Sequence, residues 1–199
     1  IAAASSEHVF GSPFDLTNQM LLYLVTDAPN PNDYEYVTAI VSTLTSIIIL
    51  LRGRTLGLFT AKKMVRQAYD GVSQALGEEA KVAVRGSTKP RITLLAQGVT
   101  GGRANMLRKF RLNPNAALLG TDSFWEGVDI PGDSLSGVVI PKLPFATPYD
   151  PIIDAIAEAE DIHPFHDLSI PKMILRMRQG VGRLIRSEND KGVAVILDS

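Results

Sequence analysis

Short apolar runs that alternate with longer helical patterns constrain the fold of this chain more than any other feature. The short runs, which predict strands, lie at residues 20–25, 56–60, 92–96, 116–120, 136–140 and 193–197. The segments that read as helices lie at residues 34–51, 61–76, 101–112, 152–159 and 171–187. Strands that alternate with helices of this length form a mostly parallel sheet with helices on both faces. The chain has no internal repeat and no low-complexity linker, so we predict a single α/β domain over residues 1–199.

Composition excludes several classes of protein. The 20 Lys and Arg residues nearly balance the 21 Asp and Glu residues, so any nucleic-acid binding must come from a local patch. The absence of cysteine excludes disulfides, Cys-ligated zinc and Cys-ligated iron–sulfur clusters within these residues, and it fits a cytoplasmic protein. The most apolar stretch, residues 37–51, is shorter than the roughly 20 residues that cross a bilayer. Its helical spacing predicts a buried helix, and we expect no membrane association.

The N-terminus has neither an initiator Met nor the charged region of a signal peptide. We therefore expect the chain to be a fragment that begins inside a larger protein.

A polar stripe near the C-terminus is the most informative local feature. On a continuous helix, Gln179, Arg183 and Arg186 share one face. The opposite, apolar face carries Met173, Met177, Val181 and Leu184. The two glycines in this stretch cost a helix about 1 kcal/mol each relative to alanine, which indicates a close approach to the backbone there. Converging guanidinium groups suit a polyphosphate, and a solvated amphipathic face is the alternative.

The loop at residues 120–132 follows a predicted strand and holds three glycines, three carboxylates and the only tryptophan. A carboxylate here can bind a ribose hydroxyl, while Thr121 and nearby backbone amides can bind a phosphate. Turn geometry alone is the alternative explanation for its Asp and Gly residues. In an open α/β sheet, ligands bind beyond the carboxyl ends of the strands. Chemistry is therefore expected in the loops that follow Thr60, Ala96, Gly120 and Ile140.

Several motifs resemble those of superfamily 2 helicases. Gly127-Val128-Asp129-Ile130-Pro131 resembles motif V, and residues 179–186 resemble motif VI in the form Gln-x-x-Gly-Arg-x-x-Arg. Residues 58–63 stand where motif IV is expected, although Ala61 replaces the serine of many relatives. The sequences of residues 124–129 and 182–187 are similar to those of the DinG branch, which is related to the XPD helicases. Ser12-Pro13-Phe14-Asp15 and Leu143-Pro144-Phe145-Ala146 also match that branch, so the resemblance covers nearly the whole chain.

The resemblance implies a RecA-like three-layer sandwich, the second motor domain of a DinG-type helicase. In this family ATP lies between two such domains. By this resemblance Arg183 and Arg186 face the phosphates, with Arg186 as an arginine finger, a group that can be worth about 10³ or more in rate. The other ATP-site residues implied are Gln179, Gly182, Gly127, Asp129 and Glu126. The residues implied to contact single-stranded DNA are Thr60, Lys62, Gln97, Gly98, Thr121 and Trp125.

Two of these assignments compete with structural explanations. Trp125 can stack on a base or pack in the core, and both interpretations remain open. A basic cluster on the predicted helix at 101–112 favours a solvated face over a DNA track. Its members are Arg103, Arg108, Lys109 and Arg111.

The departures from the family pattern are equally informative. The chain contains no Gly-x-x-x-x-Gly-Lys-Ser/Thr and no Asp-Glu-Ala-His box. This P-loop NTPase-like fold therefore lacks its own P-loop, and the fragment alone is not expected to bind or hydrolyse ATP. ATP and Mg²⁺ would be bound mainly by the N-terminal RecA-like domain of the same polypeptide, upstream of Ile1. The four cluster cysteines of the family would also lie upstream.

We expect no metal site in the chain itself. His163 and His166 flank a proline, which opposes a helical pair of metal ligands.

The sequence therefore predicts the C-terminal motor domain of an ATP-dependent DNA helicase, with single-stranded DNA as partner. Two alternatives remain open. In the first, the motor has degenerated and the domain places DNA for a fused DnaQ-type exonuclease. In the second, the domain is a non-catalytic interaction module.

Overall fold

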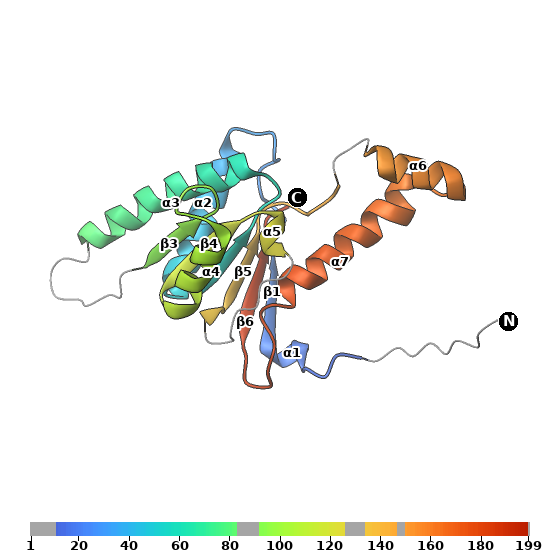
Figure 1. The fold of residues 1–199 in the computed structure, drawn as a ribbon. Coiled ribbons are helices and arrows are strands. Elements are labelled where there is room, and N and C mark those ends of the chain that lie inside the picture. The colour runs from blue at the N-terminus through green and yellow to red at the C-terminus, as the bar shows by residue number, and fades with distance from the viewer. Residues whose placement is uncertain (1–10, 83–91, 126–133, 147–149, 199) are drawn as a thin grey trace.

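A computed structural model describes residues 11–82, 92–125, 134–146 and 150–198. Its six strands form one sheet in the order β1-β6-β5-β2-β4-β3, and every neighbouring pair is parallel (Figure 1). The strands are β1 (Met20–Leu24), β2 (Thr55–Leu58), β3 (Thr93–Ala96), β4 (Ala116–Gly120), β5 (Gly137–Ile140) and β6 (Gly192–Ile196). The predicted parallel sheet is confirmed, and each strand agrees with its predicted range to within two residues.

Helices cover both faces of this sheet. One face is covered by α2 (Glu35–Leu50) and α3 (Lys62–Val82), whose apolar residues join one core cluster. The other face is covered by α4 (Arg103–Leu112), the short α5 (Asp122–Trp125) and the end of α7 (Ile170–Val181). The remaining elements are α1 (Leu16–Gln19), α6 (Pro151–Glu160) and the π-helix η2 (Pro164–Ser169). Figure 1 shows α6 and the start of α7 extending away from the sheet.

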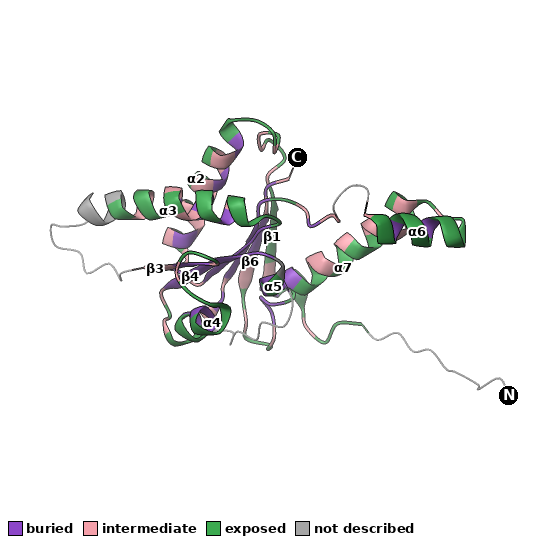
Figure 2. Ribbon diagram, turned by 45° about the horizontal axis from the view of Figure 1, so that its top comes forward, coloured by how far each residue is buried: buried purple, intermediate pink, exposed green. Residues whose placement is uncertain are grey.

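The middle strands are the centre of the protein, as Figure 2 shows by their buried colour. All residues of β2, β4 and β5 are buried, which explains why their sequences are continuous apolar runs. The helix predicted from the most apolar stretch is α2, and its buried residues recur at intervals of four: Tyr36, Ile40, Leu44 and Ile48. Among the described residues, no helix combines the length and apolarity that crossing a membrane requires.

Strand β1 forms one edge of the sheet and pairs only with β6. Four successive apolar side chains of β1 are about half exposed or more: Leu21 at 64%, Leu22 at 49%, Tyr23 at 57% and Leu24 at 54%. Because neighbouring side chains of a strand point to opposite faces, apolar side chains are exposed on both faces of this edge in the part of the chain that the structure describes.

The predicted helix at residues 171–187 is wrong beyond Val181. Gly182 ends α7, and its N–H donates to the Arg178 carbonyl at 2.8 Å. The chain then turns, because Leu184 and Ile185 enter the core with 0% and 4% exposure. Arg183 and Arg186 therefore do not continue a helical stripe, and burial of the two apolar residues between them sets where each one lies.

A buried tyrosine ties α2 to the loop after β5. The Tyr36 hydroxyl donates to the Pro141 carbonyl at 2.6 Å. Burial, and secondarily the negative charge of Asp198, raises the pKa of Tyr36 to about 12. Asp198 in turn accepts a hydrogen bond from the Leu143 N–H at 2.8 Å.

We predict that Tyr36→Phe lowers the free energy of unfolding by about 1 kcal/mol at pH 7, the value of one lost hydrogen bond. An unfolded tyrosine ionises near pH 10, whereas folded Tyr36 ionises at about 12. The contribution of Tyr36 to the free energy of unfolding is therefore complete below pH 10 and is lost as the pH rises toward 12. Urea unfolding at pH 7 and pH 11 should show that the difference in the free energy of unfolding between wild type and variant is smaller at the higher pH. An equal gap at both pH values would contradict the assignment.

Candidate functional site

The carboxyl ends of β3 and β4 bring Gln97 and Thr121 together. The Gln97 side-chain oxygen accepts from the Thr121 backbone N–H at 2.7 Å and from its hydroxyl at 2.9 Å. The Gln97 amide nitrogen donates to the Ser123 hydroxyl oxygen at 3.3 Å. Thr121 is only 5% exposed, so its hydroxyl serves Gln97 rather than the surface. Gly98 follows with a φ of +75°, a backbone conformation that favours glycine.

Arg103 joins this group from the first residue of α4. Its Nε donates to the Ser123 carbonyl at 3.0 Å, and its guanidinium lies 5.8 Å from the centre of the Phe124 ring. Arg108, also exposed, instead donates to Asn105 of its own helix at 3.1 Å. The structure therefore separates Arg103 from the rest of the basic cluster that sequence placed on one solvated face.

Thr60 and Lys62 lie at the same edge of the sheet. Thr60 follows β2, Lys62 begins α3, and both are exposed. The Phe59 N–H donates to the Gly120 carbonyl at 2.8 Å, which holds the end of β2 beside the end of β4. Three of the four predicted loops thus meet here, at the carboxyl ends of β2, β3 and β4.

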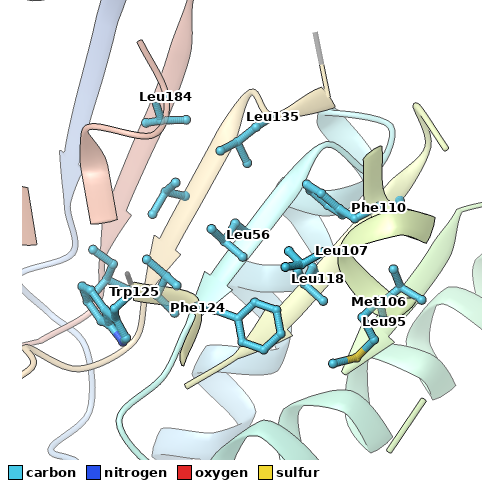
Figure 3. Packing of buried hydrophobic residues seen from close by; sticks show 14 of the residues in the cluster. Leu56, Leu95, Met106, Leu107, Phe110, Leu118, Phe124, Trp125, Leu135 and Leu184 are labelled. Atoms are coloured by element: carbon cyan, nitrogen blue, oxygen red, sulfur yellow. The ribbon is translucent and has the colours of Figure 1, made fainter. Parts of the chain in front are cut away.

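Trp125 belongs to the core, and the alternative that it stacks on a base is wrong for this structure. Its side chain is 1% exposed, and its indole N–H donates to the Phe59 carbonyl at 3.1 Å. Figure 3 shows the indole among the buried residues of the α4 and α7 side of the sheet.

The close approach predicted at the glycines is made by this same tryptophan. A Cβ at Gly180 would lie 2.9 Å from Leu58 Cδ1 and 2.9 Å from Trp125 Cζ3. At Gly182, a Cβ would lie 2.7 Å from the Arg178 carbonyl oxygen, so the second glycine serves the end of the helix.

Arg183 is buried, with 7% exposure, and its Nη2 donates to the Trp125 carbonyl. Gln179 is exposed, so the two residues do not form the common polar face predicted from helical spacing. The guanidinium of Arg183 instead ties the turn after α7 to α5.

Arg186 is half-buried and begins a loop that its own neighbours close. The backbone N–H groups of Arg186 and Ser187 donate to Asp190 Oδ2 at 2.8 and 2.9 Å. Burial tends to raise the pKa of Asp190, but these hydrogen bonds, one with the Ser187 side chain, and the charge of Arg186 outweigh it and lower that pKa. Sequence analysis did not identify Asp190, although the polar run at residues 187–190 signals a loop.

Comparison with known proteins places this geometry in a family. Residues 44–199 match the family described as the helicase C-terminal domain. This chain belongs to that family.

The relatives of this helicase C-terminal domain confirm the resemblance to the DinG branch. The ATP-dependent DNA helicase YoaA of Haemophilus influenzae is 34% identical over 98% of this chain and 29% of its own length. The YoaA helicase of Escherichia coli is 36% identical over 94% of this chain and 28% of its own. The 3'-5' exonuclease DinG of Bacillus subtilis is 35% identical over 94% of this chain and 20% of its own. The chain thus spans less than a third of these relatives.

Solved structures show the same RecA-like fold. An XPD helicase matches with a TM-score of 0.61 and 17% identity over 90% of this chain and 31% of that one. Saccharomyces cerevisiae Dbp5, bound to RNA and ADP BeF3, matches with a TM-score of 0.54 and 19% identity, over 91% of this chain and 36% of that one. The predicted RecA-like sandwich is confirmed.

Three predicted ATP-site residues of this helicase C-terminal domain, Glu126, Gly127 and Asp129, lie outside the described residues. Of the described ones, Arg183 bonds to Trp125 and Arg186 begins the loop that leads into β6. Gln97, Gly98, Thr60 and Lys62 lie at the carboxyl edge of the sheet. The predicted nucleotide and DNA residues therefore form two separate groups.

We predict that Gly180→Ala destabilises the domain by about 1–3 kcal/mol, because the methyl group collides with two packed side chains. The matched control is Gly77→Ala in α3, where a Cβ would meet nothing within 4 Å. That change should stabilise the helix by up to about 1 kcal/mol. Urea unfolding of both variants checks the pair, and stabilisation by both would contradict the packing argument.

Proposed function

We propose that this chain is the C-terminal motor domain of an ATP-dependent DNA helicase of the DinG branch. The observation that carries the proposal is the chain of contacts through Trp125. Its carbonyl accepts from Arg183, and its indole donates to the Phe59 carbonyl, next to the exposed Thr60. One buried residue thus joins the candidate nucleotide residues to the candidate DNA edge.

The nucleotide surface lies on the α7 side. In this proposal the guanidinium of Arg186 faces the triphosphate of ATP, the substrate, held mainly by a second RecA-like domain of the same polypeptide. When ATP is bound, Arg186 stabilises the negative charge that develops on the transferring phosphoryl group. Gln179 and Gly182 border this surface.

Arg183 has a different role in this proposal from the one first expected. Its buried guanidinium is bonded to the Trp125 carbonyl, which supports a role in holding motif VI against α5. The Mg²⁺ that accompanies ATP would be bound by the other domain, and the described residues of this chain contain no group of three His, Asp or Glu side chains that could bind it.

The DNA surface is the carboxyl edge of β2, β3 and β4. Phosphate oxygens accept hydrogen bonds, and this edge offers donors: the Gln97 amide nitrogen, the Ser123 hydroxyl, the Arg103 guanidinium, Thr60 and Lys62. Contacts of this kind bind the backbone of single-stranded DNA without reading its sequence. Thr121 orients the Gln97 amide so that its nitrogen faces the Ser123 hydroxyl.

We predict that Arg186→Ala lowers the DNA-stimulated ATPase rate of the intact polypeptide by about 10³. Binding of single-stranded DNA without ATP should remain at the wild-type level. Arg178→Ala, which removes an exposed arginine from α7, is the matched control and should leave the rate unchanged. A near wild-type rate in the Arg186 variant would refute the arginine-finger assignment.

For the DNA surface, Arg103→Ala should reduce the slope of log K against log salt for single-stranded DNA by about 0.7, the contribution of one phosphate contact. Arg108→Ala, on the same helix, should leave the slope unchanged. Fluorescence anisotropy with a labelled oligonucleotide over a salt series measures both. Equal slopes for the two variants would remove Arg103 from the interface.

One observation favours a second candidate function. The Bacillus subtilis relative, 35% identical, bears the name of a 3'-5' exonuclease. In this alternative the domain places DNA for a nuclease elsewhere in the polypeptide. Nuclease activity that persists at full rate after Arg186→Ala, in a protein without ATPase activity, would favour it.

A wild-type ATPase rate after substitution of Gln179 or Arg183 would instead favour the other alternative, a non-catalytic interaction module.

A further inference from the structure

One side chain from the beginning of the described chain holds the loop that follows Arg186. The amide nitrogen of Gln19 donates toward three backbone carbonyl oxygens, at 2.8 Å for Ser187, 3.1 Å for Glu188 and 3.0 Å for Asp190. The Gln19 side chain is buried, with 8% exposure. Three carbonyl dipoles therefore converge on one buried donor, and leaving them without it would cost free energy.

The position of Gln19 is itself fixed by the residues before it. Asp15 caps α1, and its carboxylate accepts from the Asn18 side-chain amide at 2.6 Å. Phe14 packs against the hydrophobic core on the α7 side. Gln19 ends α1, and the next residue pairs with Gly192 at the start of β6. The Ser12-Pro13-Phe14-Asp15 motif, to which no function was assigned, thus places Gln19 beside the loop.

The loop is held from two sides. Asp190 Oδ2 closes it from within by accepting the backbone N–H groups of Arg186 and Ser187. Gln19 holds it from outside by donating to the backbone carbonyls of Ser187, Glu188 and Asp190. Both sets of bonds act on the backbone of the loop.

We infer that Gln19 is a positioning residue for Arg186, and that it fixes the backbone from which the arginine reaches the phosphates of ATP. The inference rests on the proposed function of Arg186. Gln19 bonds to backbone carbonyls, not to the nucleotide, so its loss should lower the turnover rate rather than the affinity for ATP. A displacement of about 1 Å in a group that acts on the reacting atoms can cost about 10² in rate.

The test is Gln19→Met in the intact polypeptide, a variant of similar size without a donor. We expect the kcat of the DNA-stimulated ATPase to fall by about 10-fold or more, within that 10² limit, while the KM for ATP stays unchanged. Gln19→Lys, whose ammonium group can donate to the same carbonyls, should restore much of the rate. Thr17→Ala, an exposed residue of α1, is the control and should behave as wild type.

Hydrogen exchange keeps the proposal testable if a variant is less stable. The amides of Arg186 and Ser187 should exchange faster in Gln19→Met, whereas those of β2 and β4 should keep their protection. A uniform rise throughout the sheet would mean that Gln19 only supports the fold, and would overturn the inference.

A double-mutant cycle separates this inference from the proposed function. If Arg186→Ala alone leaves the ATPase at the wild-type rate, the proposed function fails. If Arg186→Ala is inactive but Gln19→Met keeps the wild-type kcat, only the positioning inference fails. It fails equally if Gln19→Met lowers kcat by the same factor with and without Arg186. Loss of the Gln19 effect in the Arg186→Ala background is the supporting result.

Discussion

The burial of Trp125 is the contact on which the rest of the site depends. The indole fills the space between the end of β2 and α7, and it fits only because residue 180 is a glycine. Its indole N–H donates to the Phe59 carbonyl, and its backbone carbonyl accepts from Arg183. A large aromatic ring with a satisfied N–H gives much buried apolar area together with a fixed orientation. The bond from Arg183 to the Trp125 carbonyl ties the turn after α7 to α5, and burial of Leu184 and Ile185 holds that turn in the core.

The sheet could be predicted from the sequence because its strands are buried on both faces and appear as short apolar runs. The helix α2 could be predicted for a similar reason, since Ile40, Leu44 and Ile48 recur on one side. The end of α7 could not, because Leu184 continues the apolar spacing while its side chain in fact enters the core after a turn. The local spacing of apolar residues cannot show whether the helix continues or the chain turns so that Leu184 enters the core.

The resemblance named positions for a site but did not predict their contacts. Trp125 and Thr121 lie within a motif that marks a binding loop, yet one is in the core and the other orients Gln97. Gln19 gave no sequence signal, and Arg103 was predicted only as one member of a solvated basic cluster, because their partners lie 168 and 20 residues away. Contacts of this kind depend on which strands become neighbours in the sheet. They can be recognised only after the strand order is known.

The bare edge at β1 has a consequence for how this domain behaves in solution. An edge strand with unpaired backbone groups and apolar side chains on both faces is a template for pairing with another strand. Two copies of these 199 residues can therefore associate edge to edge, with Leu22 and Tyr23 from each copy removed from water. Association of this kind would bury apolar side chains at the edge of the sheet and leave the packed centre of the sheet unchanged.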